Sequence, residues 1–266
     1  MVTLSACRGR KPPQNISLTD TLTARGDWPP GSTSDDTEQL ILLAENLIST
    51  GGSERAFLTA LAAALPTMHG AGPTTRRAVA RFEATGSLTA DGGGTNGAMM
   101  RVLPIGWVTP ATETQHRREL VERMTKTTHA DARAIATAGA IAAMGSWALE
   151  ACTARELIAV AREELEHFGV STVEEWEPSP GGVSLDVMDT LEAVLHVLGL
   201  HEEPVDAMRY AVSLGGDTDT VAAIVGGILS CRQDAVDIPW ASQVVLPSSL
   251  EKLAQGLRAT RRSLYA

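Results

Sequence analysis

The sequence lacks several features that define common protein classes. Only three of its 266 residues are cysteine, at positions 7, 152 and 231, and their spacing matches no metal site. Few, scattered cysteines are typical of a reducing compartment, so we expect a cytoplasmic location. No apolar run reaches the ~18 residues of a membrane span, and the first ten residues contain no apolar core of a signal peptide.

Positive charge is also scarce. The formal net charge is −10 and the sequence pI is about 5.1. Proteins that bind nucleic acid generally owe their affinity to Lys and Arg facing phosphates, so we expect neither nucleic acid nor a membrane as a partner. An acidic chain is compatible with the capture of cations, and a locally positive pocket for an anion is still possible.

The alternating pattern of β-strands is absent too, and runs of β-branched residues are short. With 44% hydrophobic and 20% charged residues, the chain can form a core. Residues 1–33 are broken by proline pairs and predict an irregular arm, and residues 34–266 predict a single all-α domain. Periodicity and end signals predict helices over about residues 35–48, 53–65, 73–86, 112–126, 132–149, 154–168, 185–198, 204–214, 221–229 and 249–262. The N-caps expected for the first and seventh of these are Asp35, with Glu38 as its reciprocal partner, and Ser184.

Two acidic segments each lie at the start of an apolar helix. Residues 215–220 read Gly-Gly-Asp-Thr-Asp-Thr, and residues 34–37 read Ser-Asp-Asp-Thr. Carboxylates and hydroxyls are the ligands that hard divalent cations prefer, and a bound cation relieves the repulsion among four carboxylates. Helix capping is the alternative interpretation, because Asp, Ser and Thr at a helix start accept hydrogen bonds from free N–H groups. Our hypothesis is that the two helix starts meet and hold metal between them.

Other candidate residues are less specific. The glycine-rich loop at residues 92–98 can bring backbone N–H groups to a diphosphate, although a flexible surface turn is the simpler interpretation. His129 can hydrogen-bond a phosphate or a ribose, or can simply begin a helix. Trp28 can stack on a base or act as an anchor, and Arg101 is expected to be a structural ion-pair partner. A solvated helix face is expected to carry Arg76, Arg77 and Arg81.

Four segments, in this order, resemble the motifs of the ADP-ribosylglycohydrolase family. Residues 34–38 resemble its first metal motif, and residues 95–106 resemble its substrate loop. Thr128 and His129, followed by a small-residue helix, are similar to its third landmark. Residues 215–220, followed by Val-Ala-Ala-Ile-Val-Gly-Gly, resemble its most specific signature. The resemblance covers about residues 28–266.

The resemblance implies an all-α fold with a binuclear Mg²⁺ or Mn²⁺ site in a central cleft. It also implies hydrolysis of the bond between ADP-ribose and a protein side chain or a small N-ribosylated acceptor. By motif position the metal ligands are Ser34, Asp35, Asp36, Asp217, Asp219 and Thr220. The substrate-binding residues are Asn96, Gly97, Ala98 and His129. Asp36 or Asp219 is the residue expected to accept a proton during catalysis.

The chain departs from the family at two places. Ser34 stands where the family usually has Thr, and the hydroxyl needed for ligation is kept. Family members usually begin with a glycine-rich helix whose acidic residue often helps catalysis, and nothing in residues 1–33 matches it. This second departure leaves two alternatives open. One is an N-glycoside hydrolase of a nucleoside- or nucleotide-like metabolite, and the other is a non-catalytic protein that binds ADP-ribose.

Overall fold

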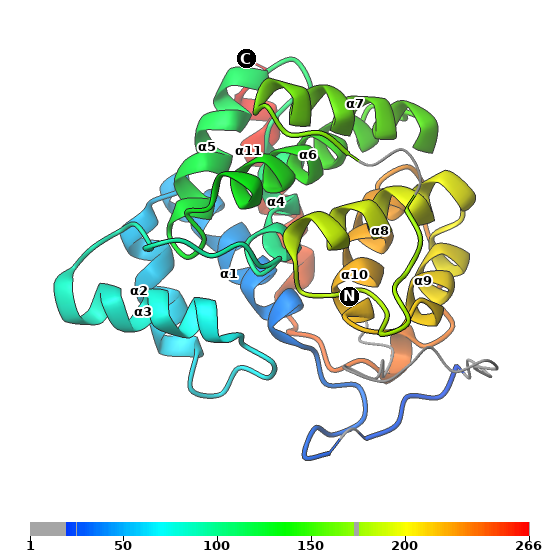
Figure 1. The fold of residues 1–266 in the computed structure, drawn as a ribbon, viewed down its shortest axis with the longest axis horizontal. Coiled ribbons are helices and arrows are strands. Elements are labelled where there is room, and N and C mark those ends of the chain that lie inside the picture. Colours follow the sequence, from blue (N-terminus) through cyan, green and yellow to red (C-terminus); the bar gives the residue numbers. More distant parts are fainter. Residues whose placement is uncertain (1–19, 25, 173–175, 266) are drawn as a thin grey trace.

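The computed structural model describes residues 20–24, 26–172 and 176–265, and across them it is built from helices (Figure 1). Within that part of the chain only isolated β-bridges occur, and no strand forms, which confirms the all-α prediction. The α-helices are α1 (Asp35–Thr50), α2 (Glu54–Ala64), α3 (Pro73–Thr85), α4 (Leu103–Val108), α5 (Thr114–Lys126), α6 (Ala132–Ala148), α7 (Ala154–His167), α8 (Val187–Leu200), α9 (Pro204–Ser213), α10 (Thr218–Ser230) and α11 (Leu250–Ser263). Two short 3-10 helices, η1 (Met99–Arg101) and η2 (Ala241–Gln243), complete the set.

Helix α6 lies at the centre of the molecule. It packs against α4, α5, α7, α8 and α10, and most of its side chains are buried on every side. Its sequence is dominated by Ala and Gly, so neighbouring helices can approach its backbone closely.

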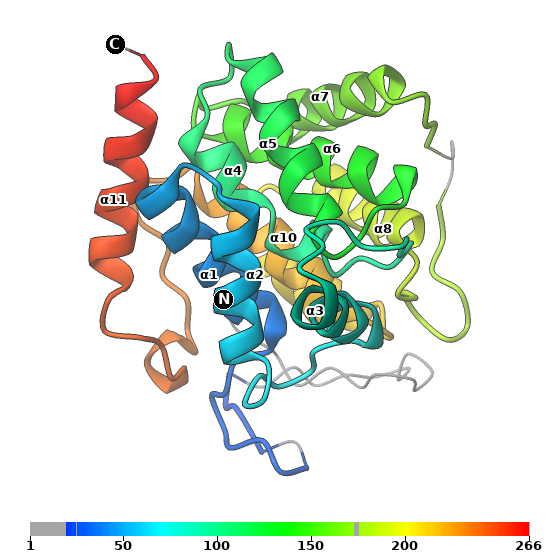
Figure 2. The same ribbon diagram turned by 90° about the vertical axis from the view of Figure 1, so that its left-hand side faces the viewer.

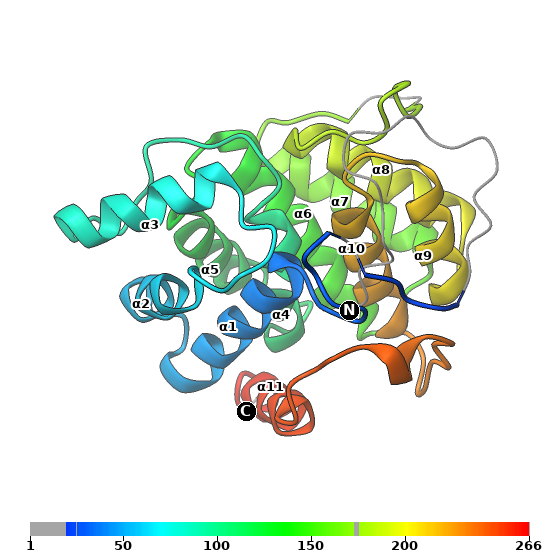
Figure 3. The same ribbon diagram turned by 90° about the horizontal axis from the view of Figure 1, so that it is seen from below.

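The remaining helices form two groups around the middle. Helices α2 and α3 lie on one side of α1, and α8 and α9 lie on the far side of α10 (Figures 1 and 3). Helices α1 and α10 contact each other between these groups. Helix α11 runs along the outside and packs on α1 and α4 (Figure 2). The two acidic helix starts are therefore both carried by central elements.

The structure corrects several predicted helix ends. Asp35 is the first residue of α1 and does not cap it, since Ser34 occupies the N-cap position. The cap of α8 is Asp186, whose side chain accepts from the Met188 N–H, and not Ser184. Helix α10 begins at Thr218, three residues earlier than the apolar pattern.

A short helix, α4, was not predicted at all. It begins at Leu103 and carries Pro104 in its first turn, where a missing N–H costs nothing. In a sequence, a proline inside an apolar segment more often indicates the end of a helix than its beginning. Among the described helices, none is both long and apolar enough to cross a bilayer.

Candidate active site

The two acidic motifs, more than 180 residues apart in sequence, meet at Asp36. The Thr220 hydroxyl at the start of α10 donates to Asp36 Oδ1 at 2.9 Å. The Ser34 hydroxyl donates to Asp36 Oδ2 at 2.8 Å. Neither Ser34 nor Asp217, the two N-cap residues, makes a side-chain capping bond. The polar groups at these two helix starts are thus directed at each other, which weakens capping as the reason for the acidic pattern.

The glycines before Asp217 are required by the turn that holds it. Gly216 has φ +77°, and a Cβ there would lie 2.1 Å from the carbonyl oxygen of Val183. That oxygen accepts a hydrogen bond from Asp217 N at 2.8 Å, while Val183 N donates to Gly215 O at 2.9 Å. The loop before α8 therefore fixes the turn that carries Asp217.

The carboxylates are buried and repel one another. Asp36 is 2% exposed, and its pKa is raised well above the usual value by burial first and then by Asp219, Asp35 and Asp217. Its hydrogen bond from Ser34 acts in the opposite direction. Asp219 is 3% exposed, and neither of its oxygens has a hydrogen-bond partner among the described residues. Buried polar atoms of folded proteins are almost always paired, so this carboxylate is poised for something other than packing.

These features fit a cation better than any protein partner. The donor set consists of carboxylates and hydroxyls, the oxygen ligands that Mg²⁺ and Mn²⁺ take. Positive charge at this place would offset the repulsion at Asp36 and satisfy the oxygens of Asp219. In the described part of the chain, however, no three His, Cys, Asp or Glu side chains are arranged as a formed metal site. The binuclear cleft and its ligand set therefore remain predictions.

A buried arginine, Arg101, is linked by hydrogen bonds to the first acidic motif. It is 1% exposed, and burial lowers its pKa to about 9 while nearby Asp35 opposes that shift. Arg101 donates to Gln39 Oε1 at 2.8 Å, and Gln39 donates in turn to Asp35 Oδ2 at 3.2 Å. Its guanidinium also lies over the Phe57 ring, 4.9 Å from the centroid. Arg101 has a structural role, as expected: it is linked to Asp35 through Gln39 and also interacts with that carboxylate by charge.

The predicted substrate loop orients the second acidic motif. Asn96 is buried and donates from Nδ2 to Asp217 Oδ2 at 2.6 Å and to Thr190 Oγ1 at 2.9 Å. Gly97 lies against His129, because a Cβ at Gly97 would lie 2.9 Å from His129 Cε1. Ala98 is buried.

His129 is buried between two hydroxyls and is neutral. Burial first, and then Arg101 and Arg77, lower its pKa to about 3. Thr128 Oγ1 accepts from Arg101 Nη2 at 2.7 Å, so its own proton is available for His129 Nδ1 at 2.8 Å. The His129 proton is then on Nε2, which lies 3.0 Å from Thr95 Oγ1.

A cavity of about 80 Å³ opens beside these groups, lined by members of both acidic motifs and of the loop. Its lining includes Asp35, Thr220, Asn96, Gly97 and His129. Several further lining residues were not singled out in the sequence: Gly70, Thr74, Thr95 and Leu185.

Trp28 packs on His69 near this cavity, with ring centroids 4.9 Å apart, in agreement with an anchoring role. Gln39 and Thr190 were not predicted to belong to the site. The spacing of four residues between Asp35 and Gln39 on one helix could have suggested the first of these. Thr190 lies 94 positions from Asn96, and no local signal joins the two.

Fold and site together define a class: an all-helical protein with a buried cluster of aspartates and hydroxyls at two facing helix starts. The sequence pattern of the family described as ADP-ribosylglycohydrolase matches residues 3–265, and the chain belongs to that family.

Individual relatives agree with this assignment. The chain is 29% identical over 238 residues to ADP-ribosyl-[dinitrogen reductase] glycohydrolase of Rhodospirillum rubrum, covering 82% of this chain and 76% of that protein. It is 25% identical over 260 residues to an uncharacterized protein of Archaeoglobus fulgidus, covering 87% and 82%. A solved structure titled ADP-ribosylglycohydrolase-related protein complex superposes with a TM-score of 0.82 at 26% identity. That superposition covers 96% of this chain and 91% of the other.

Proposed function

We propose that this protein is a metal-dependent hydrolase that cleaves the glycosidic bond between ADP-ribose and an acceptor. One observation carries the proposal. The second acidic motif donates a hydrogen bond to Asp36 of the first, beside a buried Asp219 whose two oxygens lack hydrogen-bond partners in the described chain. The printed name of the Rhodospirillum rubrum relative supports the same reaction class and a modified protein as the acceptor.

Six residues are proposed to hold two divalent cations, Mg²⁺ or Mn²⁺: Ser34, Asp35, Asp36, Asp217, Asp219 and Thr220. When bound, the cations would supply charge that offsets the carboxylate repulsion, orients sugar hydroxyls and lowers the pKa of a bound water.

The chain's own residues divide the remaining work. Each oxygen of Asp36 already accepts one hydrogen bond, from Ser34 or from Thr220, which fixes this carboxylate between the two helix starts. Neither oxygen of Asp219 has a hydrogen-bond partner in the described chain, so an oxygen that does not bind a cation can take a proton, and we assign that role to Asp219. As water adds to the anomeric carbon, the bond to the acceptor breaks, Asp219 takes the proton from water, and a proton returns to the acceptor.

The loop and His129 would bind the sugar and its phosphate. Gly97 lets the loop pack directly against the His129 ring, where a Cβ would lie 2.9 Å from Cε1, and His129 is fixed as a neutral hydrogen-bonding group. A neutral imidazole serves here by hydrogen bonding and not by charge.

Two measurements test the proposal. Thermal melting with Mg²⁺ or Mn²⁺, and then with ADP-ribose added, should show two successive stabilising shifts. The metal-loaded protein is then incubated with a panel of ADP-ribosylated side chains and N-ribosides, and the products are separated by chromatography. Release of free ADP-ribose from a modified side chain is the expected result.

The other outcomes separate the alternatives. Turnover of N-ribosides alone would indicate an N-glycoside hydrolase of small metabolites. Stabilisation by ADP-ribose without turnover of any panel member would indicate a binding protein. If neither cation raises the melting temperature, the metal site is refuted.

A further inference from the structure

A second cavity, larger than the first, lies between α3 and the glycine loop. Its volume is about 290 Å³. The two cavities share Thr74, and the lining of the second includes Thr128, the neighbour of His129. At Gly93 the loop touches both sides, since a Cβ there would lie 2.6 Å from Thr74 Cγ2 and 3.2 Å from His129 Cδ2. The two cavities are therefore neighbours on either side of this contact, with Thr74 in the wall of both.

The lining of this cavity is positive. It contains two guanidinium groups, Arg77 and Arg81, and one carboxylate, Asp91. Arg81 is held in place, with Nη1 2.6 Å from Asp91 Oδ2 and Nε donating to Thr89 O at 3.2 Å. Arg77 takes part in no hydrogen bond or ion pair of the described residues, which leaves its guanidinium available to a ligand. The sequence predicts a solvated face for both arginines, and in the structure Arg77 is exposed on the wall of this cavity.

Two further features favour an anion in this cavity. Helix α3 begins with Pro73, Thr74 and Thr75 and has no acidic side chain in its first turn, so the positive end of its dipole is uncompensated there. The charge of Arg77 also reaches the first cavity, where it helps to keep His129 neutral.

The lining offers nothing for an aromatic base. None of the residues around this cavity is aromatic, so a base entering it would find no ring to stack on. The first cavity, at about 80 Å³, is far smaller than a whole nucleotide sugar. The distal part of a larger substrate would therefore have to lie outside it, and the adjoining cavity offers a cation rather than an aromatic surface.

We infer that the cavity between α3 and the glycine loop is an anion subsite in which Arg77 pairs with a phosphate at the distal end of the ribosyl substrate. The identity of that substrate rests on the proposed function, whereas phosphate binding in this cavity does not. Arg77 is a specificity residue in this assignment. It selects ribosyl compounds that carry a phosphate beyond the sugar held at the carboxylates.

The test uses inorganic pyrophosphate as the probe and isothermal titration of the metal-free protein, so that metals cannot bridge the anion to the carboxylates. Arg76 supplies the matched control, because it is the adjacent exposed arginine on α3 and is not part of the cavity lining. Its Nε donates to Ala71 O at 3.1 Å. Saturable binding is expected in the wild type and in Arg76→Ala, and a loss of about tenfold or more in affinity is expected in Arg77→Ala.

Binding should also weaken as salt rises, and Arg77→Lys should recover part of it. The inference is overturned if the wild type shows no saturable binding, or if Arg77→Ala and Arg76→Ala bind pyrophosphate equally well.

A kinetic measurement separates this inference from the proposed function. With a substrate of the panel that is hydrolysed, Arg77→Ala should raise KM by about tenfold and leave kcat unchanged. This is expected when the lost contact stabilises the bound substrate and the transition state equally. An unchanged KM contradicts the inference, as does a loss confined to kcat. If no panel member is hydrolysed, the proposed function fails, while the pyrophosphate titration still decides whether the anion subsite exists.

Discussion

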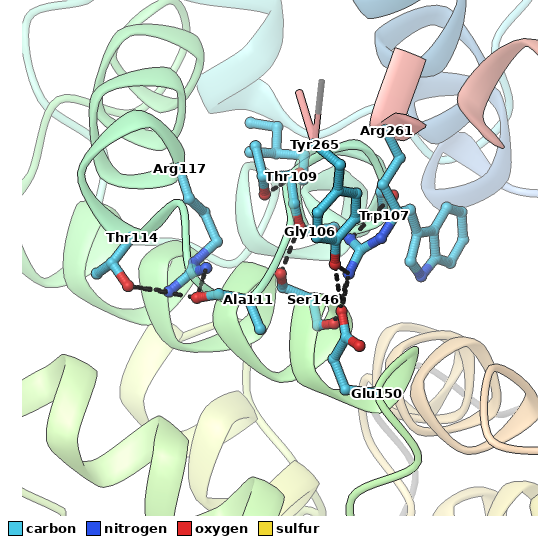
Figure 4. Close-up of polar contacts among 11 residues, drawn as sticks. Gly106, Trp107, Thr109, Ala111, Thr114, Arg117, Ser146, Glu150, Arg261 and Tyr265 are labelled. Atoms are coloured by element: carbon cyan, nitrogen blue, oxygen red, sulfur yellow. Dashed lines mark hydrogen bonds and ion pairs between the residues drawn. The ribbon is translucent and has the colours of Figure 1, made fainter. Parts of the chain in front are cut away.

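Two polar clusters, one at helix N-termini and one at helix C-termini, differ in whether their polar atoms have hydrogen-bond partners. The aspartate cluster lies at the N-termini of α1 and α10, and it contains a carboxylate whose oxygens have no hydrogen-bond partner in the described chain. The second, which we call the Arg261 cluster, joins the C-terminal parts of α4, α6 and α11 and is defined by Arg261, Gly106, Thr109, Ser146 and Glu150 (Figure 4).

In the Arg261 cluster the guanidinium makes several hydrogen bonds. Arg261 donates to Thr109 O and to Glu150 Oε1, each at 2.5 Å, and to Gly106 O at 3.2 Å. Tyr265 completes it by donating to the same Glu150 oxygen at 2.7 Å. Free carbonyls at helix C-termini and a guanidinium suit each other by charge and by geometry. The contrast indicates that the Arg261 cluster stabilises the fold, whereas the repulsion among the aspartates is unrelieved, as expected of the cation site that we propose.

The largest expected effect concerns the aspartate cluster, in the variant Asp219→Asn. Loss of this carboxylate should lower kcat by about 10²- to 10⁴-fold, the usual contribution of a positioned base. The metal-free variant should melt no lower than the wild type, because a buried charge that repels its neighbours has been removed. Steady-state kinetics and differential scanning calorimetry measure the two properties.

Asp237→Asn is the control for this variant, since Asp237 is exposed in the loop after α10 and lies in neither acidic motif. It should change neither property measurably. If Asp219→Asn is destabilised and remains fully active, the carboxylate has a structural role, and the contrast between the two clusters disappears.

Much of this architecture could be read from the sequence, but the links between distant elements could not. The motifs around Asp36 and Asp219 were located because glycines, hydroxyls and carboxylates recur at fixed local spacings. The bond from Thr220 to Asp36 spans 184 positions, and only the packing of α1 against α10 creates it. The cavity beside Arg77 could not be predicted for the same reason, because an exposed arginine on a polar helix face has the same pattern whether it borders open solvent or a cavity.

Short helices and helix caps were also not predicted correctly from the sequence. Helix α4 has only six residues, too few for a period to show, and its proline suggested an end rather than a beginning. The caps were misjudged where several acceptors compete. Asp186 and Ser184 both precede α8, and Asp189 takes the Ser184 N–H at 2.6 Å, which leaves the cap to Asp186.

An intermediate effect is expected in the Arg261 cluster, in the variant Arg261→Met. It should lower the free energy of unfolding by about 3 kcal/mol, because Glu150 and several carbonyls lose a shared donor. For a chain of this size that corresponds to roughly 6–12 °C in melting temperature. The folded fraction should retain kcat, which is checked well below the melting temperature. A loss of kcat without a loss of stability would contradict the division of roles between the two clusters.

The smallest effect concerns His129, which lies beside the aspartate cluster. Like Arg261, it is hydrogen-bonded, with a partner for each ring nitrogen. Its pKa in the folded protein is lowered to about 3, below the ~6.5 of an unfolded histidine. Above pH 6.5 both states are neutral, and below it only the unfolded chain binds the proton, so stability falls as the pH drops from 6.5 towards 3. At pH 5 this group should cost about 2 kcal/mol relative to pH 7, at 1.36 kcal/mol for each pH unit.

The variant His129→Gln keeps a hydrogen-bonding side chain but removes the titrating group. Urea unfolding at pH 7 and pH 5 gives the change in the free energy of unfolding between these pH values for each protein. The difference between the two changes is the contribution of His129. This subtraction is needed because the raised pKa of Asp36 acts in the opposite direction: protonation favours the folded state, and that stability is lost as the pH rises. If the two proteins lose equal stability between pH 7 and pH 5, His129 is protonated in the folded state and can contribute charge, not only a hydrogen bond, to an anionic ligand.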